Sequence, residues 1–204
     1  MTDTGETPGA RVDAVVKIGG SLLRDPGRLR EVLDIVADAG KEHALLVVPG
    51  GGLFADAVRA MDRRIGLTED AAHWMAILAM DQYAHLLHSR LRGATLVSTP
   101  AAAVAAIATG ALPVLAPYRW LRDADPLPHS WDVTSDSIAA WIAGALAAPR
   151  LVLIKPAGVA GTEAVDPYFP HARRRGTSCS LLPADRADAL RPLLRAAGGP
   201  VPLR

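Results

Sequence analysis

Two lysines stand where the sequence predicts that a strand ends and a loop begins. Lys17 lies near the end of the apolar run "AVVKI", and Lys155 ends the run "RLVLIK". The 204-residue chain contains one further lysine, so arginine supplies most of its positive charge. An ammonium group at a strand end can follow a phosphoryl group as negative charge moves to the leaving oxygen. A lysine is usually a solvated surface residue, but the preference for arginine elsewhere in this chain favours a specific role for these two.

Two glycine clusters follow the first two predicted strands. Gly19 and Gly20 come directly after the strand of Lys17, with Ser21 behind them, and Gly50–Gly52 follow the second strand. Ligands bind at the carboxyl ends of the strands in an open parallel sheet, and glycine there lets backbone N–H groups approach an anion. Each cluster alone is equally well explained as an ordinary turn. Neither has the spacing of a P-loop or a dinucleotide fingerprint, but together with Lys17 they favour phosphate binding.

The densest polar cluster is "HSWDVTSDS", which covers residues 129–137. Thr134, Ser135 and Asp136 precede a helical pattern, and one of them is expected to cap the start of that helix. A helix needs only one such cap. The remaining carboxylate can orient the two lysines, and the hydroxyl groups together with His129 can hold a substrate.

Other polar residues carry weaker signals. Arg59 lies in the helix predicted after the triple glycine, where a surface ion pair explains it equally well. We interpret His73 and His85 on a long helix as packing residues. The arginine run at residues 173–175 is a solvated turn or, alternatively, a clamp for a nucleotide phosphate. The sequence has neither a cysteine–histidine pattern with metal-ligand spacing nor a nucleophile elbow, so we predict no metal centre held by the protein itself.

The order of the elements predicts a parallel sheet covered by helices. Short apolar runs alternate with helical patterns, which is typical of βα units. Strands are expected at residues 13–18, 44–48, 95–98, 112–117 and 150–154, and helices at 26–39, from 53, 68–91, 100–108, from 135 and 185–196. Residues 118–131 are predicted to be a proline- and charge-rich loop. A second long loop, at residues 155–177, is expected to be functional or disordered because of its length.

Composition restricts the class of protein further. The net charge is +1 with acids and bases interspersed, which argues against nucleic-acid and membrane partners. The single cysteine, Cys179, cannot form an internal disulfide and fits a reducing cytoplasm. We expect residues 1–10 to be a disordered tail and residues 11–204 to form a single domain.

Three motifs, in this order, resemble the amino acid kinase family: "VVKIGGSLL", "VVPGGGLFADAVRAMD" and "TSDS". The resemblance covers roughly residues 12–159. It implies an α/β fold, a three-layer αβα sandwich around a mostly parallel sheet. It also implies a cytoplasmic kinase that uses ATP, with Mg²⁺ bound through the nucleotide phosphates, and that forms a homodimer or a higher homo-oligomer.

The resemblance also assigns roles to individual residues. Lys17, Asp136 and Lys155 would be catalytic, and the carboxylate would orient the two lysines. The residues expected to bind the nucleotide are Gly19, Gly20, Ser21, Gly158, Asp166 and Tyr168. The residues expected to bind the acceptor are Gly50, Gly51, Gly52, Arg59, His129, Ser130, Trp131, Thr134 and Ser135.

A narrower similarity points to the acceptor. The stretches "GGGLFADAVRAMD", "AAHWMAILAMDQYA" and "HSWDVTSDS" are similar to a branch of the family that acts in methanofuran biosynthesis. The acceptor in that branch is an aminomethylfuran-methanol phosphate, so the resemblance implies that a small-molecule phosphate monoester is converted to a diphosphate.

The donor side departs from the family pattern. Where relatives carry roughly "VDGVY", this chain reads "PAGVAG", which lacks the acidic group and the aromatic ring. The chain also ends before the strand that usually closes the nucleotide lobe, so we expect a shortened C-terminal lobe. These departures leave two alternatives open. One is a catalytically degenerate binding or scaffold protein, and the other is a family kinase acting on a carboxylate or a nucleoside monophosphate.

Overall fold

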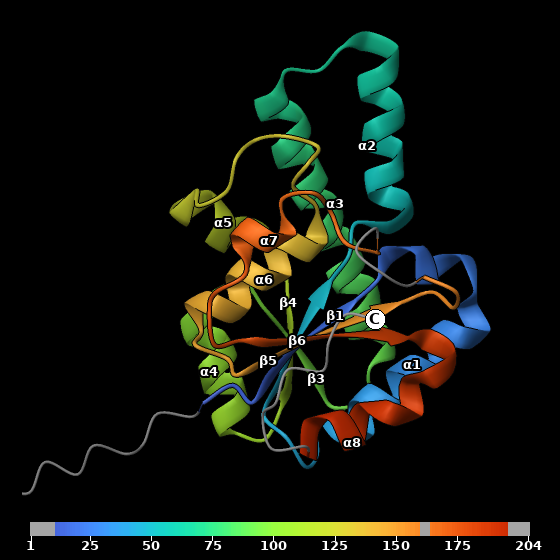
Figure 1. The fold of residues 1–204 in the computed structure, drawn as a ribbon, viewed down its shortest axis with the longest axis vertical. Helices are drawn as coiled ribbons and strands as arrows, with labels where there is room; N and C mark the ends of the chain where they lie inside the picture. The colour runs from blue at the N-terminus through green and yellow to red at the C-terminus, as the bar shows by residue number, and fades with distance from the viewer. Residues whose placement is uncertain (1–10, 160–163, 196–204) are drawn as a thin grey trace, which may run out of the picture.

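The computed structural model describes residues 11–159 and 164–195, which form a six-stranded sheet covered by helices (Figure 1). All strand pairs in this part of the chain are parallel, in the order β3-β4-β2-β1-β5-β6. The predicted tail at residues 1–10 lies outside the described residues. The strands are β1 Ala14–Ile18, β2 Leu45–Pro49, β3 Ala94–Val97, β4 Leu112–Leu115, β5 Arg150–Lys155 and β6 Ser178–Pro183.

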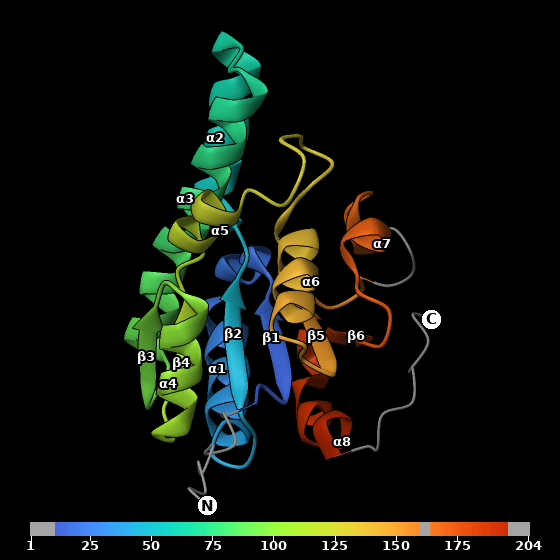
Figure 2. The same ribbon diagram turned by 90° about the vertical axis from the view of Figure 1, so that its left-hand side faces the viewer.

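Helices cover both faces of the sheet. Helices α1 and α8 lie on one face, and α4, α6 and α7 lie on the other (Figures 1 and 2). Every residue of β1 and β2 is buried, as an uninterrupted apolar run predicts for strands that are covered on both sides. The three-layer αβα sandwich with a parallel sheet is therefore confirmed. The α-helices are α1 Pro26–Ala39, α2 Gly52–Ile65, α3 Glu69–Arg90, α4 Pro100–Ala108, α5 Tyr118–Ala124, α6 Ser135–Ala145, α7 Phe169–Ala172 and α8 Leu190–Arg195, and 3₁₀ turns lie at η1 Gly20–Arg24 and η3 Ala184–Ala189.

Local capping sets the start of several helices. Asp25 accepts a hydrogen bond from the Arg28 amide at the start of α1, and Thr68 accepts one from Ala71 at the start of α3. These side chains satisfy N–H groups that have no partner within the helix. The helix boundaries predicted at these positions are confirmed.

The structure departs from the expected elements in four places. The predicted loop at residues 118–131 contains α5, which is only seven residues long and has one buried side chain, Leu121, so its helical pattern is too short to recognise. The loop predicted at 155–177 contains the short helix α7. The strand β6 was not expected. It lies at the edge of the sheet with only Cys179 and Leu182 buried, which leaves a weak apolar pattern. The final helix starts at Leu190, after a 3₁₀ turn with a kink.

Helix α2 and the first part of α3 project beyond the carboxyl ends of the strands, while the rest of α3 lies against the sheet (Figures 1 and 2). The two projecting segments pack against each other along their length and join at Gly66, whose φ of 68° lies in the left-handed region that favours glycine. The base of this projection therefore lies beside the glycine turns that follow β1 and β2. Among the described residues, no helix is both long and apolar enough to cross a membrane.

Candidate active site

Two lysines and one carboxylate meet at the carboxyl end of the central strands. Lys17 Nζ donates to Asp136 Oδ1 at 2.8 Å, and Lys155 Nζ donates to Asp136 Oδ2 at 2.5 Å. Lys17 comes from β1, Lys155 from the neighbouring β5, and Asp136 from the first turn of α6. Lys17 and Asp136 are 3% and 4% exposed, so the structure brings together the three residues that the sequence assigned to catalysis.

The charges of this trio do not cancel. Burial by itself would raise the pKa of Asp136, but the positive charges and hydrogen bonds of Lys17 and Lys155 outweigh burial and hold that pKa below its ordinary value of 3.8. Burial and the nearby charge of Lys17 lower the pKa of Lys155, although Asp136 acts in the opposite direction. With one carboxylate between two ammonium groups, the trio carries an excess positive charge that suits an anion.

The two glycine turns approach each other closely beside this trio. A Cβ atom on Gly20 would lie 2.0 Å from the Gly52 amide nitrogen, so only glycine fits there. The Gly19 amide donates a hydrogen bond to the Ile154 carbonyl oxygen of β5, and the Gly50 amide donates one to the Ile18 carbonyl oxygen of β1, each at 2.9 Å. The backbone of Gly20, and of Gly51 and Gly52 at the start of α2, instead lines a cavity. A helix start of this kind favours a bound anion because its N–H groups are free.

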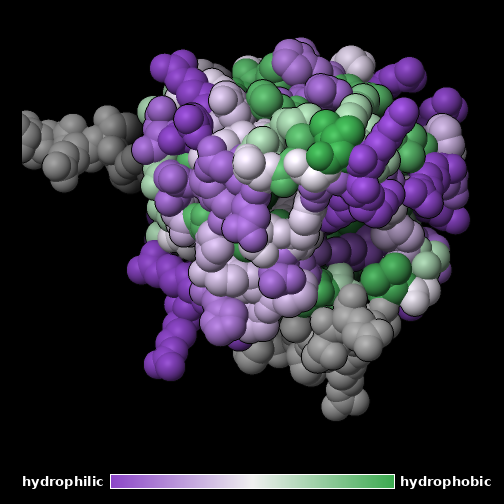
Figure 3. All heavy atoms as spheres, turned by 90° about the horizontal axis from the view of Figure 1, so that it is seen from above, coloured by the Kyte–Doolittle hydropathy of each residue, from purple (hydrophilic) through white to green (hydrophobic). Residues whose placement is uncertain are grey.

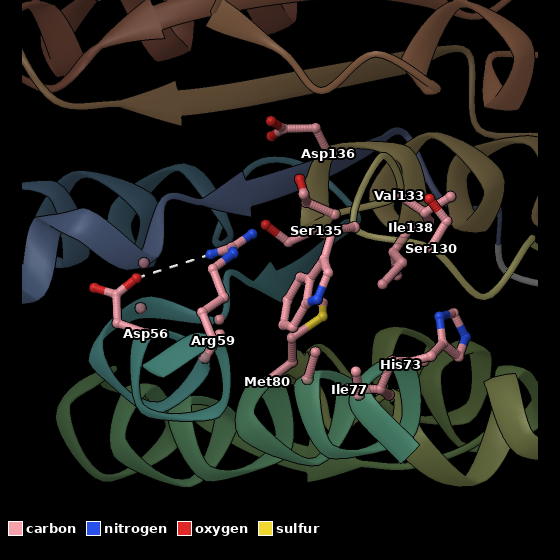
Figure 4. A pocket seen from close by; sticks show the side chains of 18 of the residues that line it. Asp56, Arg59, His73, Ile77, Met80, Ser130, Val133, Ser135, Asp136 and Ile138 are labelled. Atoms are coloured by element: carbon pink, nitrogen blue, oxygen red, sulfur yellow. Dashed lines mark ion pairs between the residues drawn. The ribbon is translucent and has the colours of Figure 1, made fainter. Parts of the chain in front are cut away.

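The cavity has a volume of about 440 Å³ and lies between the α2–α3 projection and the start of α6 (Figure 4). In Figure 4, Arg59 extends from α2 into the same space that Ser135 and Asp136 enter from α6. The predicted site residues that line it are Lys17, Gly20, Ser21, Gly51, Gly52, Arg59, Ser130, Trp131, Thr134, Ser135, Asp136 and Lys155.

One wall of the cavity is a fixed aromatic ring. The indole Nε1 of Trp131 donates to Asp62 Oδ2 at 2.7 Å, and the Arg59 guanidinium carbon lies 4.7 Å from the centre of the indole ring. Asp62 also accepts a hydrogen bond from the Leu67 amide at 2.9 Å, at the turn between α2 and α3. The pKa of Asp62 is lowered by these hydrogen bonds, so the carboxylate is charged. The ring is thus held from two sides, by a hydrogen bond and by a cation–π contact.

Six predicted site residues do not line the cavity. Gly19 and Gly50 support the strand ends, as described above, and Gly158 is exposed on the loop after β5. The His129 ring has Asp70 Oδ1 2.6 Å from Nδ1 and Asp125 Oδ1 2.8 Å from Nε2. His129 stacks on His73 with 4.0 Å between ring centres, and His73 is the histidine that lines the cavity. The last two are Asp166 and Tyr168.

Asp166 and Tyr168 lie beside α6 instead of facing the cavity. The Asp166 carboxylate accepts hydrogen bonds from Thr134 and Ser137, at the first turn of α6. The Thr134 side chain makes no cap of its own helix. The Tyr168 ring lies 5.4 Å from that of His171. The expected helix cap is therefore supplied by a distant carboxylate and not by the local Thr-Ser-Asp sequence.

Several residues of the site were missed from the sequence. Asp62 shares one face of α2 with Ala55 and Arg59, because residues spaced by three or four fall on the same side of a helix. That spacing was the available signal for Asp62. His73 is a packing residue by its sequence pattern, but the structure places it in the cavity lining. Nothing in the local sequence distinguishes a packing histidine from one that lines a cavity. The other cavity residues not assigned from sequence include Arg24, Asp56, Glu69, Ile77 and Met80.

Known proteins are similar to this chain in sequence and in fold. One relative, the [5-(aminomethyl)furan-3-yl]methyl phosphate kinase of Methanocaldococcus jannaschii, is 31% identical over 140 residues. The match covers 69% of this chain and 63% of the relative's length.

Solved structures extend the likeness in fold. The uridylate kinase of Archaeoglobus fulgidus matches with a TM-score of 0.57 and 21% identity, over 74% of this chain and 68% of that one. The UMP kinase of Ureaplasma parvum matches with a TM-score of 0.53 and 16% identity, over 74% and 72%. Residues 14–159 match the amino acid kinase family as a whole, and they include the trio and both glycine turns. The chain therefore belongs to the amino acid kinase family.

Proposed function

We propose that this protein is an ATP-dependent kinase that converts a small phosphate monoester into a diphosphate. The observation that carries the proposal is the trio of buried Lys17, buried Asp136 and part-buried Lys155, with its excess positive charge beside two glycine turns. Two phosphate groups must lie side by side in such a reaction. Two ammonium groups and free backbone N–H groups are the partners that phosphate oxygens require.

The proposed step breaks the bond between the terminal phosphorus of ATP and its bridging oxygen. A phosphate oxygen of the acceptor forms the new bond to phosphorus, and ADP leaves with the electron pair of the broken bond. Lys17, on the central strand, stabilises the charge on the transferring group. Asp136 holds both ammonium groups in place without itself accepting a proton, since its pKa is low.

We propose that Mg²⁺ enters with the nucleotide. Within the described part of the chain, no three His, Cys, Asp or Glu side chains are grouped so that they could hold a metal ion. Mg²⁺ commonly keeps several water ligands and binds through substrate phosphates. The ion would neutralise phosphate charge, and Lys17 and Lys155 would position the phosphate groups.

The polarity of the cavity supports an acceptor with opposite charges at its two ends. Lys17, Lys155 and the start of α2 line one part of the cavity, and the carboxylates of Asp62 and Glu69 line another; Asp56 and Arg59 lie on α2 between these two parts. Gly52 and Asp62 are ten residues apart on α2, so at 1.5 Å per residue their backbones are separated by about 15 Å along the helix. The relative named above is a kinase for a substrate with a phosphate, a furan ring and an aminomethyl group. We propose that the ring lies against Trp131 and the ammonium group faces the acidic end.

Replacing Lys17 tests the proposed reaction. We expect Lys17→Met to lower kcat by about 100-fold or more, because one positive charge on the transferring group is lost. Lys41→Met is the matched control, since that lysine is 70% exposed on its side chain and pairs only with Asp38 in the structure. ADP release with ATP, Mg²⁺ and the aminomethylfuran phosphate measures both. Equal activity of the two variants contradicts the proposal.

Binding and acceptor measurements separate the remaining possibilities. Calorimetry that detects neither ATP–Mg²⁺ nor ADP binding would favour a binding or scaffold protein. If the proposal is right, the aminomethylfuran phosphate has a higher kcat/KM than UMP or acetylglutamate. An analogue with a hydroxyl group in place of the amine should lose about 10-fold or more, since the ammonium–carboxylate contacts are absent.

We also propose that the chain forms a homodimer or a higher homo-oligomer through α2 and α3. Large apolar side chains are exposed along these two helices, and Figure 3, viewed from the projecting end, shows hydrophobic side chains among a largely hydrophilic surface. Contiguous exposed apolar surface commonly marks a protein interface. The exposed apolar residues are Leu53, Met61, Ile65, Met75 and Leu78.

A further inference from the structure

The carboxylate of Asp166 accepts four hydrogen bonds from the first turn of α6. The Thr134 amide and hydroxyl donate to Oδ2 at 3.0 Å and 2.7 Å, and the Ser137 amide donates to the same oxygen at 3.0 Å. The Ser137 hydroxyl donates to Oδ1. Asp166 is 8% exposed and lies in the segment that joins β5 to α7. These four side-chain hydrogen bonds therefore tie the region after Lys155 to the start of α6.

These four bonds replace the cap that α6 lacks locally. Thr134 is the N-cap residue and Ser137 is the third residue of the helix, and their N–H groups are among those that a helix leaves without partners. A local Ser, Thr or Asp side chain normally accepts such bonds. Here the acceptor lies 29 and 32 residues away along the chain. The orientation of the first turn of α6 thus depends on a tertiary contact.

Asp136 lies inside the turn that Asp166 holds. It is the second residue of α6, between Thr134 and Ser137, and its carboxylate bridges Lys17 and Lys155. Fixing the backbone on both sides of a residue limits where its side chain can reach. Asp166 therefore limits the position of the Asp136 carboxylate by holding the backbone on both sides of Asp136.

Asp166 also adds negative charge near the site. The negative charge of Asp166 raises the pKa of Lys155, against the stronger lowering by burial and Lys17. The other charged or titratable groups that face Lys155 are Asp136 and the Cys179 thiol. A carboxylate at a helix start is itself favourable, because it faces the positive end of the helix dipole.

We propose that Asp166 is a positioning residue, which orients Asp136 between the two lysines and couples the segment after β5 to the start of α6. The predicted effect of Asp166 on kcat rests on the proposed kinase function, whereas its predicted effect on the position of Asp136 does not. The geometry predicts that Asp166→Asn disturbs the site although Asp166 touches none of its reacting groups. An asparagine has one acceptor oxygen, and its NH₂ group would face N–H or O–H donors.

Competitive amine labelling tests the assignment without any turnover. The chain contains three lysines, Lys17, Lys41 and Lys155, so mass spectrometry can follow each of them across a pH series. We expect the labelling midpoint of Lys155 to move to lower pH in Asp166→Asn, because a neighbouring negative charge is lost and Asp136 is displaced. Lys41 serves as the internal reference. A merely structural loosening would expose Lys155 and move its midpoint upward, toward that of a free lysine, which would overturn the proposal.

Two further variants complete the experiment: a control that removes the N-cap of another helix, and a variant that removes only one of the hydrogen bonds to Asp166. Thr99→Ala removes the N-cap of α4, where Thr99 accepts from Ala102, far from the site, and should leave both the Lys155 midpoint and kcat unchanged. Ser137→Ala removes one of the four hydrogen bonds and should shift the midpoint in the same direction by a smaller amount. If Asp166→Asn fails to fold, this variant decides: no shift in Ser137→Ala overturns the proposal.

Kinetics supply the second readout. We expect Asp166→Asn to lower kcat by about 10- to 100-fold while the KM of the acceptor changes less than threefold, because Asp166 positions catalytic groups and contacts no substrate. Unchanged kcat with a folded protein contradicts the proposal. A wild-type protein without kinase turnover, but with the predicted labelling shift in Asp166→Asn, would refute the proposed function and leave the positioning role standing.

Discussion

Asp136 carries a buried negative charge that both lysines of the site share. Each carboxylate oxygen accepts one ammonium group, at 2.8 Å and 2.5 Å. Removing one partner of a buried ion pair leaves the others uncompensated, which costs more than the pair itself contributes. At the scale of single residues, the carboxylate is therefore a structural requirement for the buried Lys17 and the part-buried Lys155, besides the catalytic role proposed for it.

Asp136→Asn should destabilise the fold at neutral pH. The buried ammonium group of Lys17 and the part-buried one of Lys155 lose their shared partner, and the expected loss is about 3–5 kcal/mol of unfolding free energy. The folded-state pKa of Asp136 is lowered, so its contribution is present above pH 3.8, the unfolded value, and is lost as pH falls through the lower folded value. Urea unfolding of both proteins at pH 7 and at lower pH measures this difference. Asp38→Asn, at an exposed pair with Lys41, should change little. Equal effects of the two variants would contradict the expectation.

His73 should make stability depend on pH over a different range. Burial and the charge of His129 lower the pKa of His73 from 6.5 to about 4, although Asp125 and Asp70 act in the opposite direction. Between pH 6.5 and pH 4, His73 binds a proton in the unfolded chain but not in the folded one. The free energy of unfolding is therefore highest above pH 6.5 and falls as pH decreases toward 4. His73→Gln should flatten this decline in urea unfolding, whereas His88→Gln, at an exposed position, should leave it intact. A decline of unchanged slope in His73→Gln would exclude this origin.

At the scale of elements, the contact between the two glycine turns decides whether the cavity forms. The turn after β1 and the start of α2 meet so closely that a Cβ on Gly20 would lie 2.0 Å from the Gly52 nitrogen and 2.4 Å from its Cα. Both colliding groups are backbone, so they cannot move aside as a flexible side chain would. The backbone N–H groups of the two turns can therefore line one anion site only if no side chain lies between the turns.

Gly20→Ala should destabilise the protein and open the cavity. We expect a loss of about 1–3 kcal/mol from overpacking, together with weaker nucleotide binding. Gly27→Ala is the matched control: its Cβ would meet only the Asp25 Oδ1 atom, at 3.5 Å, and it lies within α1. That variant should gain about 0.5–1 kcal/mol, because alanine loses less backbone entropy in a helix. Thermal unfolding and calorimetry with ATP–Mg²⁺ measure both. Similar stability of the two variants would show that the turns can separate.

At the scale of the whole molecule, the α2–α3 projection serves two surfaces. Its inner side forms one wall of the cavity, and its outer side exposes Met61 and Ile65, which are 45% and 62% exposed. Ile65 is the last residue of α2 and is more exposed than the other large apolar residues described here. A partner that covers this side would also hold the wall of the candidate active site in place.

Charged substitutions on the projection should weaken self-association. The double variant Met61→Lys with Ile65→Lys would place two charges in an apolar contact, and we expect sedimentation velocity to show a lower mass than for wild type. Ala101→Lys with Ala105→Lys, on the exposed side of α4, is the control for added charge. A wild-type protein that sediments as a monomer at all concentrations would contradict the proposed assembly.

Much of the fold could be predicted because its signals are local. The apolar runs of β1 and β2, the cap at Asp25 and the cap at Thr68 each depend on residues within a few positions. The short helix α5 and the edge strand β6 could not be predicted, since seven residues with one buried side chain and a strand with two carry too little pattern.

The sequence by itself determined which residue types stand at the strand ends and helix starts, including Lys17, Lys155 and Asp136. Only the tertiary structure decided which of these groups meet, because Lys17 and Asp136 lie 119 residues apart and their contact depends on the order of the strands. It also decided that His73 and not His129 lines the cavity, and that Asp166 caps α6. Local patterns specify how a segment folds, whereas the partner of a buried charge is set by packing between segments that are distant along the chain.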